Sequence, residues 1–152
     1  MRVVALDLGD RRIGVAVCDP RGTVATPVKV LDRSSSRSGG KRLDHQNIAE
    51  LVDELEAAKV IVGLPLSLDG SVGPAAQRVL EEIDQLQTFL NVSVESYDER
   101  LTTVEAERSL RQMSVKGQSK RKVIDQVAAT VILQAWLDAG KKESTSIGEM
   151  NE

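Results

Sequence analysis

Short apolar runs open the chain and predict three neighbouring strands. Val3 to Leu6 and Ile13 to Val17 are continuous apolar runs, separated by the turn residues Gly9 to Arg12. Such runs are typical of buried strands. A second turn at Asp19 to Gly22 leads into Thr23 to Leu31, which predicts a third strand. Because tight turns join antiparallel neighbours, we expect these strands to form an antiparallel meander.

The middle of the chain alternates between helical and extended patterns. Apolar residues at helical spacing predict a helix from Asp44 to Ala58, with Asp44 as its N-cap, and a second helix around Ala76 to Leu86. Each is followed by a short apolar strand, Val60 to Gly63 and then Val92 to Tyr97. A helix between two strands is the βαβ pattern, whose crossover makes the strands parallel. We therefore expect an α/β fold with a mixed sheet.

The last third of the chain predicts two more helices and a tail. Thr102 to Glu105 has the spacing of a capping box and predicts a helix start, and Ser114 to Lys122 is a polar loop. A final amphipathic helix is expected from about Lys122 to Ala139. Residues 1–140 should form a single domain, and residues 141–152 a flexible tail.

Composition narrows the functional classes. Hydrophobic residues make up 41% and charged residues 28% of the 152 residues, as in ordinary soluble domains. No apolar run approaches the roughly 20 residues that span a bilayer, and the charge of Asp7 interrupts a would-be signal peptide. A single Cys18 excludes an internal disulfide and favours a cytoplasmic location. With one cysteine and only His45 as a histidine, any bound metal needs oxygen ligands.

Asp7 is the first candidate for chemistry, because it interrupts an otherwise apolar strand. An ionised carboxylate in such surroundings needs hydrogen bonds, a cation or a metal ion. A simpler interpretation is that Asp7 ends the strand and begins the turn.

Two further positions carry acids toward the same edge of the sheet. Asp98 and Glu99 end the last predicted strand, where the positive end of a following helix could also explain them. Asp125 lies at the margin of the apolar stripe of the final helix, and the small Ala128 and Ala129 allow that helix to approach the sheet closely. The long loop from Leu64 to Pro74 follows another strand at this edge, where α/β sheets bind ligands.

As a set, Asp7, Glu99 and Asp125 resemble the carboxylate clusters that hold Mg²⁺ or Mn²⁺. Such ions activate water and stabilise the leaving oxygen in phosphodiester cleavage. Asp98 is the alternative to Glu99 as the acid that faces the metal.

Nucleic acid is a plausible partner only through local basic patches, because the net charge is -3 and only Phe89, Tyr97 and Trp136 are aromatic. The stretch from Arg33 to Gly40 is Ser-rich and predicts a solvated, flexible loop, although its basic residues, with Lys41 and Arg42, could also contact phosphates. The best candidates for contacts to the backbone of a nucleic acid are Arg100, Arg111, Lys116, Lys120, Arg121 and Lys122.

Four stretches, which together span Arg2 to about Gly140, resemble the YqgF (RuvX-like) family. This family is classed as Holliday junction resolvases and pre-16S ribosomal RNA nucleases. The stretches are Asp7-Leu8-Gly9 through Gly14-Val15-Ala16-Val17, Val62-Gly63-Leu64-Pro65 with Asp69-Gly70, Asp98 to Thr103 with Val104-Glu105-Ala106, and Asp125 followed by Ala128-Ala129.

The resemblance implies a ribonuclease H-like fold with five mixed strands, the first three antiparallel, and helices on both faces. It also implies a cytoplasmic nuclease that uses Mg²⁺ or Mn²⁺, with the family's acids falling on Asp7, Glu99 and Asp125. The implied substrates are structured precursor RNA, in 5' maturation of pre-16S rRNA, or branched DNA. A monomer and a homodimer are both compatible with it.

Two other function classes stay open at this point. The Asp7-Leu8-Gly9 turn also resembles the phosphate-binding hairpin of the actin, hexokinase and heat-shock chaperone superfamily, although those proteins bind nucleotide between two such domains. Alternatively, the chain is a non-catalytic adaptor on ribosome precursors whose acids have structural roles. Metal-dependent cleavage distinguishes the nuclease from the adaptor.

Overall fold

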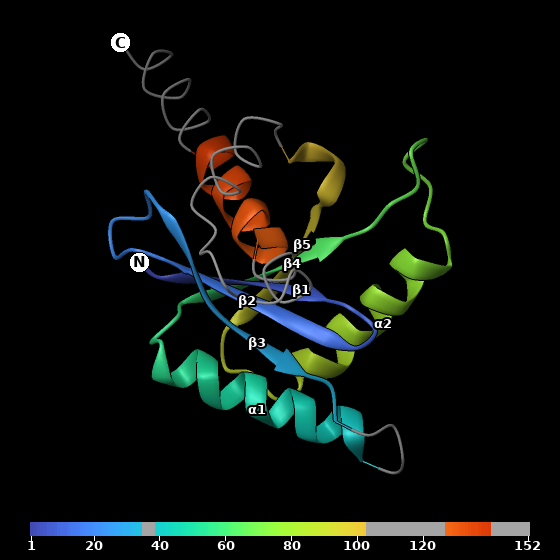
Figure 1. Ribbon diagram of the computed structural model, residues 1–152, viewed down its shortest axis with the longest axis horizontal. Coiled ribbons are helices and arrows are strands. Elements are labelled where there is room, and N and C mark those ends of the chain that lie inside the picture. The colour runs from blue at the N-terminus through green and yellow to red at the C-terminus, as the bar shows by residue number, and fades with distance from the viewer. Residues whose placement is uncertain (35–38, 103–126, 141–152) are drawn as a thin grey trace, which may run out of the picture.

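A mixed five-stranded sheet forms the centre of the protein. The computed structural model describes residues 1–34, 39–102 and 127–140. The strands are β1 (Val3–Leu8), β2 (Arg12–Cys18), β3 (Ala25–Asp32), β4 (Lys59–Leu64) and β5 (Ser93–Asp98). Their order is β3-β2-β1-β4-β5, with β1, β2 and β3 antiparallel and β1, β4 and β5 parallel (Figure 1). The predicted α/β fold and its mixed sheet are confirmed.

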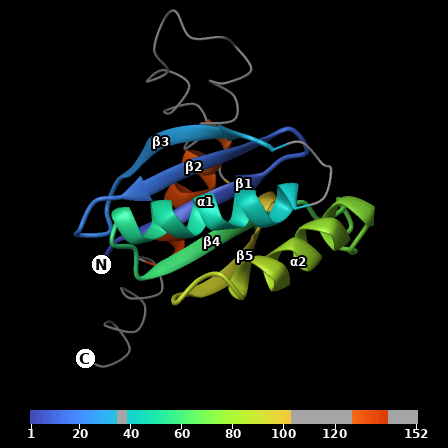
Figure 2. The same ribbon diagram turned by 90° about the horizontal axis from the view of Figure 1, so that it is seen from below.

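Helices cover both faces of this sheet. α1 (Gly40–Glu54) and α2 (Pro74–Gln87) pack on one face, and the helix at 127–140 packs on the other (Figures 1 and 2). The short helix η1 (Glu99–Leu101) follows β5 directly. No helix in these described ranges is both long and apolar enough to cross a lipid bilayer.

β1 contributes side chains to both cores. Val4 and Leu6 pack toward α1 and α2, whereas Val3 and Ala5 pack toward the helix at 127–140. Because successive side chains of a strand point to opposite faces, Asp7 lies on the face of Val3 and Ala5. The strand thus directs its one carboxylate toward the layer that holds the C-terminal helix.

The start of α1 differs from the prediction. The helix begins at Gly40, and Gly39 precedes it in the left-handed conformation with φ of 92°. Asp44 is therefore an interior helical residue and no N-cap. Its buried carboxylate instead accepts a hydrogen bond from the amide of Ser34 at 3.0 Å. A buried carboxylate needs hydrogen-bond donors. The donor here comes from another segment, so the local sequence pattern does not reveal it.

Other boundaries differ by a few residues. β3 begins at Ala25, because the Asp19 carboxylate accepts hydrogen bonds from the amides of Thr23 and Val24 and holds them in a turn. α1 ends before Ala58, since Glu56 takes a positive φ of 53°. The final helix is described over 127–140, inside its predicted span but for one residue, while its predicted first turn, positions 103–105 of the capping box and the tail lie outside the described residues.

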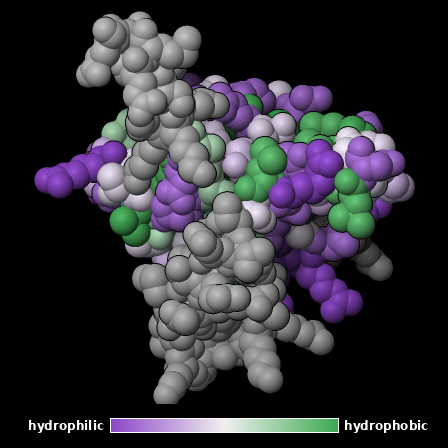
Figure 3. Space-filling model, turned by 90° about the horizontal axis from the view of Figure 1, so that it is seen from above, coloured by the Kyte–Doolittle hydropathy of each residue, from purple (hydrophilic) through white to green (hydrophobic). Residues whose placement is uncertain are grey.

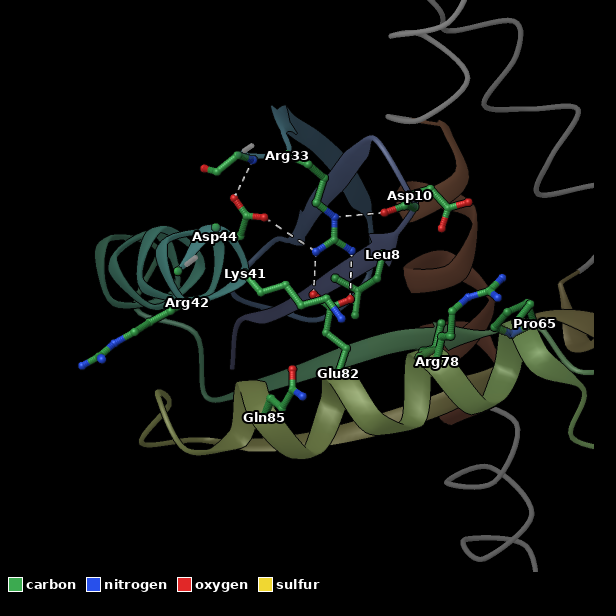
Figure 4. A pocket seen from close by; sticks show the side chains of 16 residues that line it. Leu8, Asp10, Arg33, Lys41, Arg42, Asp44, Pro65, Arg78, Glu82 and Gln85 are labelled. Carbon is green, nitrogen blue, oxygen red and sulfur yellow. Dashed lines mark hydrogen bonds and ion pairs between the residues drawn. The ribbon is translucent and has the colours of Figure 1, made fainter. Parts of the chain in front are cut away.

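Arg33 corrects the prediction that a solvated loop begins at this residue. Its side chain is only 14% exposed, and its guanidinium donates two hydrogen bonds to Glu82, at 2.6 and 2.8 Å (Figure 4). Arg33 also donates to the carbonyl of Gly9 at 3.0 Å, and Nε2 of His45 lies 2.8 Å from Glu82. This buried cluster joins the end of β3, the β1–β2 turn, α1 and α2.

The cluster changes the titration of Glu82. Burial alone would raise the pKa of Glu82, but hydrogen bonds from Arg33 and His45 outweigh it and lower the pKa from 4.5 to about 2. A carboxyl group with a depressed folded pKa stabilises the fold above its unfolded pKa. The contribution of Glu82 should therefore be complete above about pH 4.5 and be lost as the pH falls toward 2.

We predict that Glu82→Gln lowers the free energy of unfolding by about 3 to 5 kcal/mol at pH 7, because it removes the carboxylate that binds the buried Arg33 most closely and leaves the guanidinium with the more distant Asp44, at 3.8 Å. Chemical denaturation measures the change. Glu81→Gln is the matched control on the exposed side of α2 and should change the free energy by less than about 0.5 kcal/mol. The difference between Glu82→Gln and wild type should shrink as the pH falls from 4.5 to 2; equal stability at pH 7 would contradict the prediction.

Candidate active site

Asp7 lies near the C-terminal end of the central strand, where a tight turn follows it. Its backbone pairs with Gly14 of β2, and the amide of Gly9 donates to the carbonyls of Asp7 and Arg12, at 3.2 and 3.0 Å. A Cβ atom on Gly9 would lie 2.8 Å from the carbonyl oxygen of Arg12. Only glycine therefore allows the chain to turn this closely behind Asp7.

Glu99 reaches the same face from the end of β5. A Cβ atom built on Gly63 of β4 would lie 2.8 Å from Oε1 of Glu99 and 2.5 Å from Cδ1 of Ile132. Gly63 follows Ile61 by two residues, so it lies on the face covered by the helix at 127–140. The missing side chain leaves room for the Glu99 carboxylate above β4.

Asp7 lies close enough to Glu99 for its charge to affect the titration of Glu99. The pKa of Glu99 is raised, first because the carboxyl group is buried and then because the negative charges of Asp7 and Asp98 oppose its ionisation. Two carboxylates that interact in this way are stabilised by a shared cation. Their oxygen atoms are the donors that a hard divalent ion prefers.

Asp98 has a different environment from its neighbour. Its carboxylate caps η1 by accepting from the amide of Arg100 at 2.9 Å, and it binds the Arg100 guanidinium with a shortest distance of 2.7 Å. The hydrogen bond from the Arg100 side chain is the main reason that the pKa of Asp98 is lowered. Asp98 is thus neutralised by Arg100, and this arrangement favours Glu99 as the metal-facing acid.

The loop between β4 and α2 contacts Arg100 of the Asp98–Arg100 ion pair. The prediction of a long loop at this edge is confirmed. Arg100 donates to the carbonyl of Leu68 at 3.3 Å, and its guanidinium lies against Gly70, which has a positive φ of 88°. The side chain of Leu68 is 96% exposed. On the described surface in Figure 3, hydrophobic areas are separated by hydrophilic ones, so this view shows isolated apolar side chains.

Several predicted site residues lie outside the described residues: Asp125, Arg111, Lys116, Lys120, Arg121 and Lys122. Asp7 and Glu99 are brought together, and Arg100 lies beside them in its ion pair with Asp98. Across the described ranges no three His, Cys, Asp or Glu side chains are grouped closely enough to hold a metal ion. The described pair fits two carboxylate ligands of a divalent cation.

Sequence reasoning missed two features. In the sequence, Gly63 has no predicted role beyond its strand and its place in a family-like stretch, although a glycine that ends an apolar strand signals a close approach of another group. A cavity of about 790 Å³ lies between α1, α2 and the β1–β2 turn, on the face opposite Asp7. In the sequence, this cavity was indicated only by the basic residues that follow β3, Arg33, Lys41 and Arg42.

Comparison with known proteins agrees with this geometry. A family model described as RuvX, Holliday junction resolvase, matches residues 1–139. A protein of Desulforudis audaxviator (strain MP104C), named "Putative pre-16S rRNA nuclease", is 41% identical over 93% of this chain and 96% of its own length. A protein of Mycobacterium sp. (strain KMS) with the same name is 44% identical over 97% of this chain and 86% of its own length.

Solved structures are similar in fold. RuvC of Thermus thermophilus aligns with a TM-score of 0.61 and 16% identity, covering 92% of this chain and 97% of RuvC. RuvC of the same organism in complex with a Holliday junction substrate aligns with a TM-score of 0.57 and 18% identity, over 92% of this chain and 96% of RuvC. The predicted ribonuclease H-like fold is confirmed by this likeness. Because the family model covers nearly the whole chain, the chain belongs to the RuvX Holliday junction resolvase family.

Proposed function

We propose that the chain is a divalent-metal-dependent nuclease that hydrolyses phosphodiester bonds of structured nucleic acid. The observation that carries this proposal is the position of the Glu99 carboxylate above Gly63, where burial and the negative charge of Asp7 raise its pKa. Family membership and relatives named as pre-16S rRNA nucleases, matched over more than nine-tenths of this chain, support it.

Each acid has a distinct part in this proposal. Asp7 and Glu99 hold the ion from β1 and from the end of β5, and Asp125 supplies a third carboxylate from the segment that precedes the helix at 127–140. A bound Mg²⁺ or Mn²⁺ supplies Lewis-acid activation of water and charge neutralisation at the phosphate. Arg100 keeps Asp98 paired, so that Glu99 alone of the two adjacent acids faces the ion.

Precursor 16S rRNA is the substrate to test first, because that name is shared by relatives of 37 to 44% identity. Branched DNA is the second substrate, since the family model is described as a Holliday junction resolvase. The enzyme would act in the cytoplasm as a monomer or homodimer. Contacts to the backbone of the nucleic acid come from Arg100 and from a basic segment formed by Arg111, Lys116, Lys120, Arg121 and Lys122.

Substitution of the acids tests the proposal. We expect Asp7→Asn, Glu99→Gln and Asp125→Asn each to lower metal-dependent cleavage by about a hundredfold or more, because each removes one negative ligand while keeping the side-chain shape. Asp98→Asn should lower metal-dependent cleavage by less than about tenfold. A cleavage assay with Mg²⁺ or Mn²⁺ should offer precursor rRNA and junction DNA side by side.

Each variant is prepared alongside wild type, so that a contaminating nuclease would show as activity common to all samples. Undiminished cleavage by Asp7→Asn would remove Asp7 from the site. A larger loss for Asp98→Asn than for Glu99→Gln would reverse the assignment of these two acids.

Variants at Gly63 test the position of Glu99 separately from the stability of the fold. Gly63→Ala should lower the free energy of unfolding by about 1 to 3 kcal/mol, because the new methyl group overlaps Ile132 and Glu99. Cleavage by Gly63→Ala should also fall, because the methyl group displaces the Glu99 carboxylate. In Gly63→Ala/Ile132→Val the overlapping Cδ1 atom is gone, so the free energy of unfolding should recover while cleavage stays low. Denaturation and cleavage are measured on the same preparations, with Ile132→Val as the control. Full cleavage by the double variant would mean that Glu99 need not lie above Gly63.

Metal binding should stabilise the fold by relieving the repulsion between the acids. At a Mg²⁺ concentration about 100 times its dissociation constant, the stabilisation is about 2.7 kcal/mol, which raises Tm by several degrees. Asp7→Asn should blunt this response. Melting curves across a Mg²⁺ titration at fixed ionic strength measure it. If wild type does not respond to Mg²⁺ or Mn²⁺ and Asp7→Asn is less stable in chelator, the non-catalytic adaptor becomes the better account.

A further inference from the structure

The cavity on the α1 and α2 face has a basic rim. It measures about 790 Å³ and lies between the β1–β2 turn, the start of α1 and the first half of α2. In Figure 4 the side chains of Lys41 and Arg78 extend over it from α1 and α2, whereas Arg42 points away. Among the described residues, neither Lys41 nor Arg78 has an acidic side chain within ion-pair distance.

The stability of α1 does not explain why cations stand here. Lys41 and Arg42 occupy the first turn of α1, and that turn contains no acid. The positive end of a helix dipole disfavours cations in the first turn. Their position therefore costs stability and favours an anionic ligand.

The floor of the cavity carries the carboxylates of Glu82 and Asp44 and the guanidinium of Arg33. Glu82 is paired with Arg33 and His45, and Asp44 accepts from the Ser34 amide and lies 3.8 Å from Arg33. The carboxylates of the floor are thus engaged by partners inside the protein. The rim, in contrast, carries Lys41 and Arg78 over the cavity, with Asp10 as an acid beside them and Arg42 directed away. An anion at the rim can contact the two cationic side chains of Lys41 and Arg78 in a preformed hollow.

The cavity and the candidate active site share one end of β1. Leu8 and Gly9 line the cavity, while the side chain of the preceding residue, Asp7, points to the opposite face of the sheet. A nucleic acid that contacts Asp7 and also reaches Lys41 and Arg78 must pass around this edge. A branched or sharply bent molecule presents backbone on both sides of such an edge, whereas a short straight duplex presents one side to it.

We propose that this cavity binds a backbone phosphate of the nucleic-acid substrate, away from the bond that is cleaved, and that Lys41 and Arg78 thereby select branched or bent substrates. The inference rests on the proposed nuclease function. It adds a second contact point, and two linked contacts bind more tightly than either alone.

Binding measurements in chelator test the cavity without cleavage. The probes are a four-arm junction and a linear duplex of equal arm length, each prepared as DNA and as RNA. Lys41→Gln/Arg78→Gln should weaken junction binding about tenfold or more and reduce the salt slope by about 1, the value for one lost phosphate contact. Binding of the linear duplex should change less than threefold.

Arg21→Gln/Lys29→Gln is the matched control, because it removes the same charge from exposed positions away from the cavity. It should leave both affinities within about twofold of wild type. Lys41 and Arg78 are exposed, so the Tm of their double variant should also match that of wild type. In a cleavage assay the cavity variant should raise KM for the junction and leave kcat unchanged.

The outcomes separate the two proposals. If wild type cleaves, but the cavity variant and the control variant bind the junction equally well, the proposed phosphate site is overturned and the proposed nuclease function stands. If wild type shows no metal-dependent cleavage but the cavity variant binds the junction more weakly than wild type, the proposed nuclease function is overturned and the proposed phosphate site is supported. Failure of wild type to bind any of the probes overturns both.

Discussion

Burial of β1 on both faces is the constraint on which the rest of the structure depends. Val4 and Leu6 pack against the layer of α1 and α2, and Val3 and Ala5 pack against the layer of the helix at 127–140. A strand held from both sides and paired on both edges has one register, since a shift by one residue would exchange its faces. Asp7 therefore has a fixed position at the end of β1.

This edge of the sheet separates two kinds of charge. On one face, Asp7 and Glu99 repel each other, and burial makes the repulsion stronger than it would be in water. On the other face, the pair of Arg33 and Glu82 neutralises buried charge and leaves cations at the rim of the cavity. In our proposals, one face binds a metal ion and the other binds a phosphate, and the β1–β2 turn lies between them.

Local patterns predicted the elements well because each rests on nearest-neighbour physics. The apolar runs of β1 and β2 and the helical spacing of α2 depend only on side chains that are close in sequence. The prediction failed for Arg33 and Asp44, whose roles depend on Glu82 and Ser34. An arginine in a Ser-rich stretch is usually solvated, and nothing local shows that a buried acid 49 residues away will bind it.

The sequence by itself determined the strands and helices, the apolar faces that must be buried, and the family to which the chain belongs. It also brought Asp7 and Glu99 forward as candidates, because both lie at strand ends that parallel pairing places on one edge. Only the tertiary structure decided that Arg100 neutralises Asp98, that Gly63 makes room for Glu99, and that Lys41 and Arg78 face one cavity. These outcomes depend on distances between distant segments, which packing sets and sequence spacing does not.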